Sequence, residues 1–533
     1  MAARAQIGLA GLVLLVGFSV GCGSEASPTN ADAGAGDGGS ETSSGDAGDT
    51  LPTYEGSKAP KTPAEAFDLA AIKAATLGGL KWVETETTSV DGVRVLDGTW
   101  SPGAFTGLEN KTGALTTIGL ASRARIFYPD AATGPLPIVV HAAHVASAVP
   151  ADDAQYRQIA KGLGVAVVVH GELPDDGHAL GYPDAETPRD LLIDKGMAYV
   201  VQKNACKIVD LLTANFAFVL ARTSMLAVTL GQRLLEAAGK SAGPAALQGG
   251  SKEGYATWVA SAVDDRLAVA GPGNFQRLDF ESFDAYEHND GCGPNGASSA
   301  VDVLAQLTIR NWFRDTEAGK AAAKVLQVAS FVDQLRPSFF SMCGDAGMPG
   351  KHDGSYFTLG ADTHFLDGFT RPHRFERGPD NGRLTDVGRL AFLAQALVSV
   401  DPAATLGSWV RVSDAQATDG GTSVSFRTTL ASTAGVTHVY AYWNNSPNRQ
   451  FNDAGQSPWQ QVELFATGAS TTYSSAPVTP PAGEEVAWFV AAQQIVDIGK
   501  GVMVSRFDTS PIRLMRELPK LSCASVPPIG CAP

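Results

Sequence analysis

The segment that decides the fold reads Leu247-Gln248-Gly249-Gly250-Ser251-Lys252-Glu253-Gly254-Tyr255. A short strand pattern stops at a glycine pair, and a helical pattern begins after Ser251. A serine nucleophile on a strand-to-helix turn needs this construction, because its backbone is strained and only small neighbours leave room for it. The usual GxSxG spacing is not met, since Glu253 stands where the last glycine is expected. The segment predicts a nucleophile elbow; a purely structural turn or a phosphate-binding turn are the alternatives.

The chain before this segment alternates between strand and helix patterns. The runs Pro137 to His141 and Val165 to His170 are short and rich in apolar β-branched residues, and the helical stretch Ala154 to Gly164 separates them. A long helical stretch, Thr187 to Lys240, leads into a short strand, Ala245 to Gln248. This order predicts a parallel sheet that is covered by helices on both faces.

The texture changes beyond about Pro402. Period-2 runs rich in Thr, Ser and Val follow one another without helices between them: Thr422 to Leu430, Thr437 to Trp443, Val486 to Ala492 and Gly501 to Phe507. Short strands at this spacing predict a β-sandwich, with a domain boundary near residue 405. We expect Trp443, Trp459 and Trp488 to be packing residues of this domain; a carbohydrate-stacking surface is the alternative.

The run Gly249 to Leu267, GGSKEGYATWVASAVDDRL, resembles a family signature. It is similar to the GASKRGWTTWL...VDxRV motif of the PhoPQ-activated pathogenicity-related family of exported α/β-hydrolase-like proteins. The matching positions are Ser251, Lys252, Gly254, Thr257, Trp258, Asp264 and Arg266.

The resemblance extends weakly over about residues 85 to 515 and implies an architecture. Residues 61–404 are expected to form an α/β-hydrolase fold, a mostly parallel sheet flanked by helices. A smaller C-terminal β-sandwich domain over 405–517 follows it, and 518–533 form a tail.

A serine hydrolase needs a base within reach of the serine hydroxyl and a carboxylate that steadies the base. Asp345 follows the strand pattern Ser338 to Met342, where the family has its acid, although an aspartate here also fits a turn cap. The backbone N–H of Lys252, together with His144, is expected to form the oxyanion hole.

The base is where this sequence departs from the family. The family motif Pro-Asn-x-x-His-Ser-Leu corresponds to Pro379-Asp380-Asn381-Gly382-Arg383-Leu384, so Arg383 stands in the histidine position. An arginine stays protonated and cannot act as a general base, but it can pair with Asp345. His352 is the candidate replacement, because it lies seven residues past Asp345 in the same loop.

Other histidines are weaker candidates for the base. We expect His141, His144 and His170 to end strands at the edge of the sheet where Ser251 opens. His364 and His373 precede the last strand and should lie at the opposite edge. Two functions follow: a serine hydrolase acting on an ester or amide through Ser251, or a catalytically silent hydrolase-fold protein that binds a ligand or partner at the cell envelope.

The N-terminus predicts export. Residues 1–21 contain Arg4 and an apolar run from Ile7 to Val20, which is typical of a signal peptide. The sequence Ser19-Val20-Gly21-Cys22 resembles a lipobox, so we expect Cys22 to carry a lipid that anchors the chain to a bacterial membrane; a periplasmic or secreted protein is the alternative. Residues 22–60 contain almost no large apolar side chains and are expected to form a disordered tether.

Charge and cysteine content exclude some partners and cofactors. The 40 Lys and Arg residues against 55 Asp and Glu residues give a net charge of −15, so no nucleic-acid partner is expected. Of the cysteines, Cys523 and Cys531 are the best candidates for a disulfide; Cys292 and Cys343 are a second candidate pair, and Cys206 reads as a packed core thiol. No metal-ligand spacing occurs, so we expect no metal and no cofactor. The expected partners are a small-molecule or peptide substrate and, through the anchor alone, a membrane.

Overall fold

A computed structural model describes the chain in separate ranges. These are residues 59–108, 115–145, 149, 154–173, 216–250, 252–273, 317–345, 369–378, 386–399, 410–446, 459–468, 471–497, 503–510 and 513–516. The signal peptide, most of the tether, the boundary at residue 405 and the C-terminal tail lie outside them.

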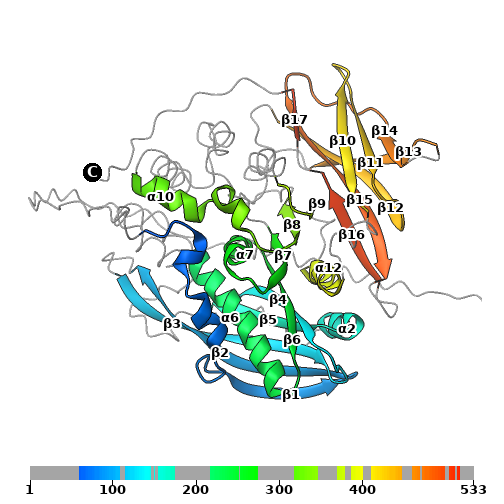
Figure 1. Ribbon diagram of the computed structural model, residues 1–533. Coiled ribbons are helices and arrows are strands. Elements are labelled where there is room, and N and C mark those ends of the chain that lie inside the picture. The colour runs from blue at the N-terminus through cyan, green and yellow to red at the C-terminus, as the bar shows by residue number, and fades with distance from the viewer. Residues whose placement is uncertain are drawn as a thin grey trace, which may run out of the picture.

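The described strands form two sheets, and the larger one belongs to the first part of the chain (Figure 1). The pairings β1 with β2, β2 with β3 and β3 with β5 are antiparallel, whereas all pairings from β5 through β4 to β9 are parallel. In spatial order the strands are β1 (Val83–Val90), β2 (Val93–Leu108), β3 (Leu115–Pro129), β5 (Ala166–Leu173), β4 (Leu136–Val145), β6 (Ala242–Gly250), β7 (Leu267–Gly273), β8 (Phe339–Asp345) and β9 (His373–Gly378).

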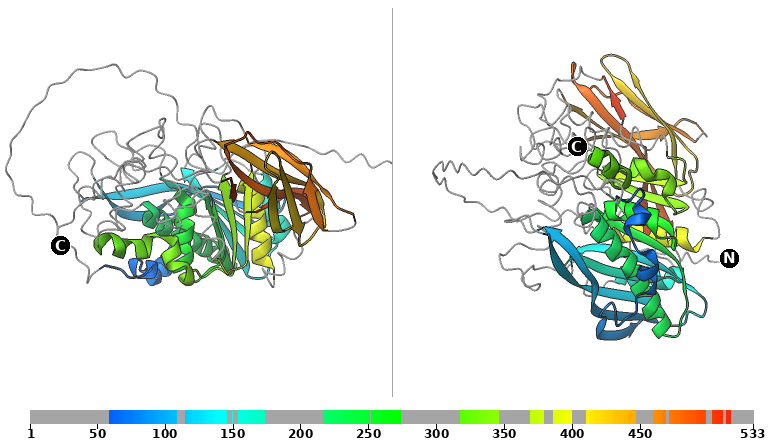
Figure 2. Two further views of the ribbon diagram at one scale, coloured as in Figure 1. Left: turned by 90° about the horizontal axis from the view of Figure 1, so that it is seen from above. Right: turned by 60° about the vertical axis from the view of Figure 1, so that its left-hand side comes forward.

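Helices cover both faces of this sheet (Figures 1 and 2). On one face lie η1 (Pro63–Ala66), α1 (Leu69–Ala74), α6 (Phe216–Ala237), α7 (Lys252–Val263), α10 (Glu317–Leu326) and η4 (Val328–Gln334); on the other lie α2 (Ala154–Leu163) and α12 (Asp386–Val398). Alternate residues of one strand enter different cores, since Val140 packs with the first set and Val139 with the second. The central strands are therefore apolar on both faces, as the sequence predicted.

The strands of the main sheet run further than the apolar patterns indicated. Strand β4 continues to Val145 and β5 to Leu173, so His141 and His170 lie inside strands. The expectation that these two histidines end their strands was wrong, because both side chains are buried and the backbone ladder continues past them. The helix expected at Ala154 to Gly164 is confirmed as α2, and the described part of the long helical stretch forms α6.

The outer strand β1 is irregular. Its pairing with β2 shifts register between Glu84 and Glu86, which marks a β-bulge. Both glutamates are exposed, and most other residues of β1 are exposed as well.

The second sheet is antiparallel and folds over on itself. Strands β10, β11 and β14 form one layer, β12, β15 and β16 form the other, and β13 joins them. Phe426 of the first layer meets Trp488 of the second, with ring centroids 5.6 Å apart. The strands are β10 (Val412–Asp419), β11 (Val424–Leu430), β12 (Val436–Ser446), β13 (Gln460–Ala466), β14 (Thr472–Ser475), β15 (Glu485–Asp497), β16 (Met503–Thr509) and β17 (Arg513–Met515), which pairs with β15. A mostly parallel, helix-flanked sheet followed by a smaller β domain is thus confirmed.

The two parts of the chain meet where β16 lies against β9 (Figure 1). Arg374 of β9 donates to the carbonyl oxygen of Phe507, and its Nε lies 3.6 Å from Oδ1 of Asp508. The same guanidinium lies over the ring of Phe392 on α12, 4.7 Å from the ring centroid. Arg374 and Asp508 are both buried, so this ion pair is part of the packed interface.

Candidate active site

The predicted elbow lies between β6 and α7. Strand β6 ends at Gly250 and helix α7 begins at Lys252, so a single residue, Ser251, connects them. Ser251 itself and the side chain of Lys252 lie outside the described residues. The backbone on either side nevertheless has the strand, one-residue turn and helix order that a nucleophile elbow requires.

Glycines make the sharp turn possible. A Cβ on Gly249 would lie 2.5 Å from the carbonyl oxygen of Glu253, because the first turn of α7 folds back onto the end of β6. A Cβ on Gly254 would overlap the backbone of Gly273, the last residue of β7. Gly254 is therefore the residue of close approach, which accounts for the glycine at this position and not at 253.

Glu253, on the first turn of α7, is 3% exposed. It interacts favourably with protonated His170 of β5 and so raises the pKa of that histidine, although burial outweighs this effect. A buried acid on the first turn of α7 was not anticipated from the sequence. The sequence carries a signal for it, since Glu253 takes the position where the GxSxG motif has its last glycine.

The expected acid also lies at the carboxyl edge of the sheet. Asp345 is the last residue of β8 and pairs with Gly378, the last residue of β9. It belongs to the strand, whereas the sequence placed it in a turn after the strand. Gly273, the last residue of β7, pairs with Cys343, which is two residues before Asp345 on β8. The backbone therefore brings Asp345 to the same edge as the elbow, two strands away, or about 10 Å; its side chain lies outside the described residues.

His144 lies near the end of β4, next to β6. Ala142 pairs with Gly249, so the backbone of His144 reaches the edge beside the elbow, as an oxyanion role requires. Its side chain is not among those described. Other predicted site residues fall wholly outside the described ranges: His352, Arg383, His364, Cys22, Cys206, Cys292, Cys523 and Cys531.

The described histidines of the main sheet have packing roles. His141 is buried, with Nδ1 2.9 Å from the hydroxyl of Tyr156 on α2. His170 is fully buried against the edge of Trp100, and its Nδ1 lies 3.4 Å from the carbonyl oxygen of Gly171. Burial lowers the pKa of His170 to about 4. His373 begins β9 at the opposite edge, as predicted, and burial lowers its pKa.

A buried arginine reaches the elbow from the other face of the sheet. Arg389 of α12 is fully buried, and its Nη1 lies 2.5 Å from where a Cβ on Gly273 would stand. Its guanidinium therefore lies against Gly273 at the end of β7, the strand that pairs with β6. Sequence reasoning missed Arg389, although it is the one charged residue after Asp386 in a helix that is otherwise mostly apolar.

Two positions matched to the family signature hold α7 to α6. Asp264 is fully buried and accepts hydrogen bonds from the Arg266 backbone N–H (3.0 Å) and side chain (2.6 Å). Arg266 also donates to Thr229 Oγ1 and to the carbonyl oxygen of Met225, both at 2.9 Å. These residues support the elbow helix from its far end and do not face the site.

The aromatic residues of the β domain are packing residues, as expected. Trp443 and Trp488 are buried in the core between the layers. Trp459 packs edge-on against Phe489, with ring centroids 5.4 Å apart.

Within the described ranges, no group of three or more His, Cys, Asp or Glu side chains is placed to hold a metal ion. Among the helices that the structure describes, none is long and apolar enough to span a membrane.

No protein-family model and no curated protein matches the chain. Solved structures similar to it include an acetyl xylan esterase from Paenibacillus sp. R4 (15% identity, TM-score 0.34, covering 62% of this chain and 90% of that one). A glucuronoyl esterase from Solibacter usitatus has 13% identity and a TM-score of 0.32, covering 63% of this chain and 92% of that one. A rice cell wall degrading esterase from Xanthomonas oryzae has 10% identity and a TM-score of 0.31, covering 60% of this chain and 95% of that one. These TM-scores are below 0.5, so the fold is argued from the strand order and packing above.

Proposed function

We propose that this chain is a serine hydrolase of the α/β-hydrolase fold that cleaves an ester or amide through Ser251. The observation that carries the proposal is the one-residue turn between β6 and α7, built on the close approaches at Gly249 and Gly254. In α/β-hydrolases a strand-to-helix junction of this kind presents a nucleophile at the carboxyl edge of the sheet. The mixed nine-stranded sheet, with helices on both faces, supports the same fold.

In the proposed reaction, the Ser251 hydroxyl attacks the substrate carbonyl carbon as a base takes its proton. The negative charge on the carbonyl oxygen is stabilised by the backbone N–H of Lys252, the first residue of α7, with help from His144. The base returns the proton to the leaving alcohol or amine, and water then releases the acid from Ser251. We assign the base to His352 and its supporting carboxylate to Asp345.

The family and the cellular location are also part of the proposal. The resemblance to the PhoPQ-activated pathogenicity-related family rests on Ser251, Gly254, Asp264 and Arg266. The roles of Gly254, Asp264 and Arg266 in building and supporting the elbow give those matches a physical reason. We further propose export through the N-terminal signal peptide and anchoring through a lipid on Cys22.

A second candidate function follows from Arg383. Because an arginine occupies the expected histidine position, the elbow can be a retained scaffold in a protein that binds a ligand or partner without catalysis. The buried Arg389 already places one cation beside the elbow. A second arginine paired with Asp345 would remove the carboxylate that a catalytic base needs.

Labelling by a fluorophosphonate probe distinguishes the two functions. Labelling of the purified chain that is lost in Ser251→Ala establishes an activated serine, and its loss in His352→Ala assigns the base. Absence of labelling in the natural chain contradicts the hydrolase proposal. If Arg383→His then restores labelling, the elbow is intact and the chain is the catalytically silent protein.

A further inference from the structure

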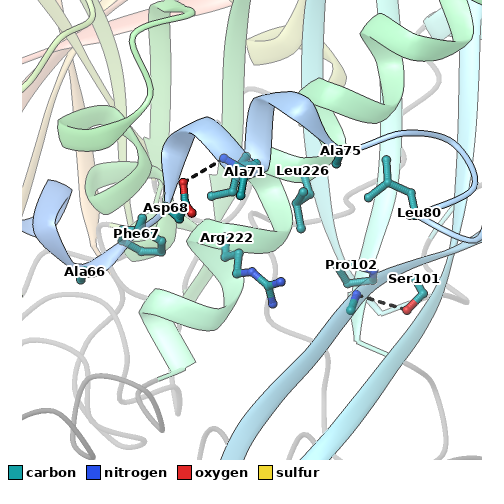
Figure 3. A pocket seen from close by; sticks show the side chains of 13 residues that line it. Ala66, Phe67, Asp68, Ala71, Ala75, Leu80, Ser101, Pro102, Arg222 and Leu226 are labelled. Carbon is teal, nitrogen blue, oxygen red and sulfur yellow. Dashed lines mark hydrogen bonds between the residues drawn. The ribbon is translucent and has the colours of Figure 1, made fainter.

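A cavity of about 340 Å³ lies between α1, the first half of α6 and β2 (Figure 3). It is separate from the elbow, because three strands of the main sheet lie between β2 and β6. At the usual spacing of strands, that separation is about 19 Å. Most of the side chains around the cavity are apolar, among them Phe67, Ile72, Leu80 and Leu226. One carboxylate also lines it, that of the exposed Asp68, whose Oδ1 accepts a hydrogen bond from the Ala71 N–H at 2.9 Å.

A bulge in β2 shapes one wall. The pairing of β2 with β3 shifts register between Trp100 and Gly103, and Gly103 has a φ of +97°, which favours glycine. Ser101 holds the bulge, since its Oγ accepts from the Gly103 N–H at 3.2 Å and donates to the carbonyl oxygen of Leu120 at 2.5 Å. The hydroxyl of Ser101 is therefore occupied, and the wall is fixed.

Arg222 is the cation of the cavity. Its side chain extends from α6 toward β2, and Nη2 lies 3.3 Å from where a Cβ on Gly103 would stand (Figure 3). Nη1 donates to the carbonyl oxygen of Ala104 at 3.0 Å. No carboxylate in the described part of the chain forms an ion pair with Arg222. Burial lowers the pKa of its guanidinium.

A guanidinium has several N–H donors in a fork that matches a carboxylate. Among the described residues, the guanidinium donates one hydrogen bond, to Ala104, and forms no ion pair, so within that part of the chain no ion pair offsets the cost of its partial burial. An anion with an apolar body would pair with the guanidinium and fill the apolar space at the same time.

We propose that the cavity binds a small monocarboxylate with a short apolar body, with its carboxylate paired to Arg222. The apolar side chains favour an alkyl or aryl group, and the absence of a second cation among the lining residues favours a single negative charge. Hexanoate is a suitable probe, and hexanamide is its neutral match in size and shape.

Isothermal titration calorimetry of the purified chain tests the proposal. We expect hexanoate to bind, and both the change to hexanamide and the substitution Arg222→Gln to weaken binding by about tenfold or more. Arg427→Gln removes an exposed arginine on β11 of the β domain and should leave the Kd for hexanoate unchanged.

Two further variants locate the ligand. Ala71→Trp adds bulk at an exposed lining position and keeps Arg222 in the chain, and it should abolish binding while the chain stays folded. Ser251→Ala should bind hexanoate as the natural chain does; loss of binding would place the ligand at the elbow and overturn the proposal. Absence of hexanoate binding, equal binding of hexanamide, or unchanged binding in Ala71→Trp would also overturn it.

Discussion

Gly254 in the first turn of α7 packs directly on the backbone of Gly273 at the end of β7, with no space for a side chain between them. Substitution Gly254→Ala must therefore push α7 off the sheet. We expect a loss of about 3 kcal/mol in the free energy of unfolding, measured in urea, since overpacking against backbone cannot relax by a rotamer change. Probe labelling of Ser251 should fall with it.

Gly134→Ala is the matched control for that substitution. A Cβ on Gly134 would meet nothing within 4 Å, so the free energy of unfolding should change by less than about 0.5 kcal/mol. Equal stability of the two variants would show that the elbow does not depend on this contact.

Two adjacent aspartates should respond very differently to the same change. Asp264 is fully buried and bonded to Arg266, so Asp264→Asn breaks a buried ion pair and should cost about 3 kcal/mol or more in urea unfolding. Asp265 pairs with Lys73 at an exposed position, so Asp265→Asn should cost less than about 1 kcal/mol. A similar cost for both variants would contradict the structural role assigned to Asp264.

His170 should make the chain less stable in acid. Its pKa falls from 6.5 to about 4 on folding, chiefly through burial, so the unfolded chain binds more protons between these values. Stability is therefore complete above pH 6.5 and decreases as pH falls toward 4, by about 3 kcal/mol at most. Three nearby groups modify this pKa: the Gly171 carbonyl oxygen and Glu253 raise it, and His141 lowers it.

Unfolding in urea at a series of pH values measures this effect. His170→Phe keeps an aromatic ring against Trp100 and should flatten the pH dependence between 6.5 and 4. His438→Gln, at an exposed position beside Glu463, should leave most of it in place. A natural chain whose stability is constant over this interval would contradict the burial of a neutral His170.

The interface at Arg374 should couple the unfolding of the two domains. Arg374→Met keeps a long side chain over Phe392 but removes the ion pair with Asp508 and the hydrogen bond to Phe507. Calorimetry should then resolve two thermal transitions, with the lower one shifted down from that of the natural chain. Arg516→Gln, which breaks an ion pair within the β domain and away from β9, should not separate the two transitions. Identical profiles for all three proteins would show that the pair does not join the domains.

The sequence predicted the central strands well and their ends poorly. Strands β4 and β5 are buried on both faces, so their apolar runs stand out, but the polar His141 and His170 inside them resembled strand ends. Strand β2 was missed because Pro102 and Gly103 interrupt it, at a bulge. Strand β10 escaped notice because most of its residues are exposed and carry no apolar alternation.

The junction between β6 and α7 was predictable because its requirements are local. Small residues must flank Ser251, and the sequence shows them at Gly249, Gly250 and Gly254. The positions of Arg389 and Arg222 were not predictable, since each side chain lies against a strand that is distant in the sequence. Arg389 reaches β7 from the last helix of its domain, and Arg222 reaches the bulge of β2.

The bulge between Glu84 and Glu86 also bears on how copies of this chain meet at high concentration. The outer strand of an open sheet offers a row of free backbone groups onto which another chain can add. On β1 the bulge interrupts this row of backbone groups, and the exposed Glu84 and Glu86 add negative charge beside it. At the other edge of the sheet, β16 lies against β9. The negative charge and the irregular backbone of β1 thus disfavour the addition of a strand from another copy of the chain, and with it growth into fibrils.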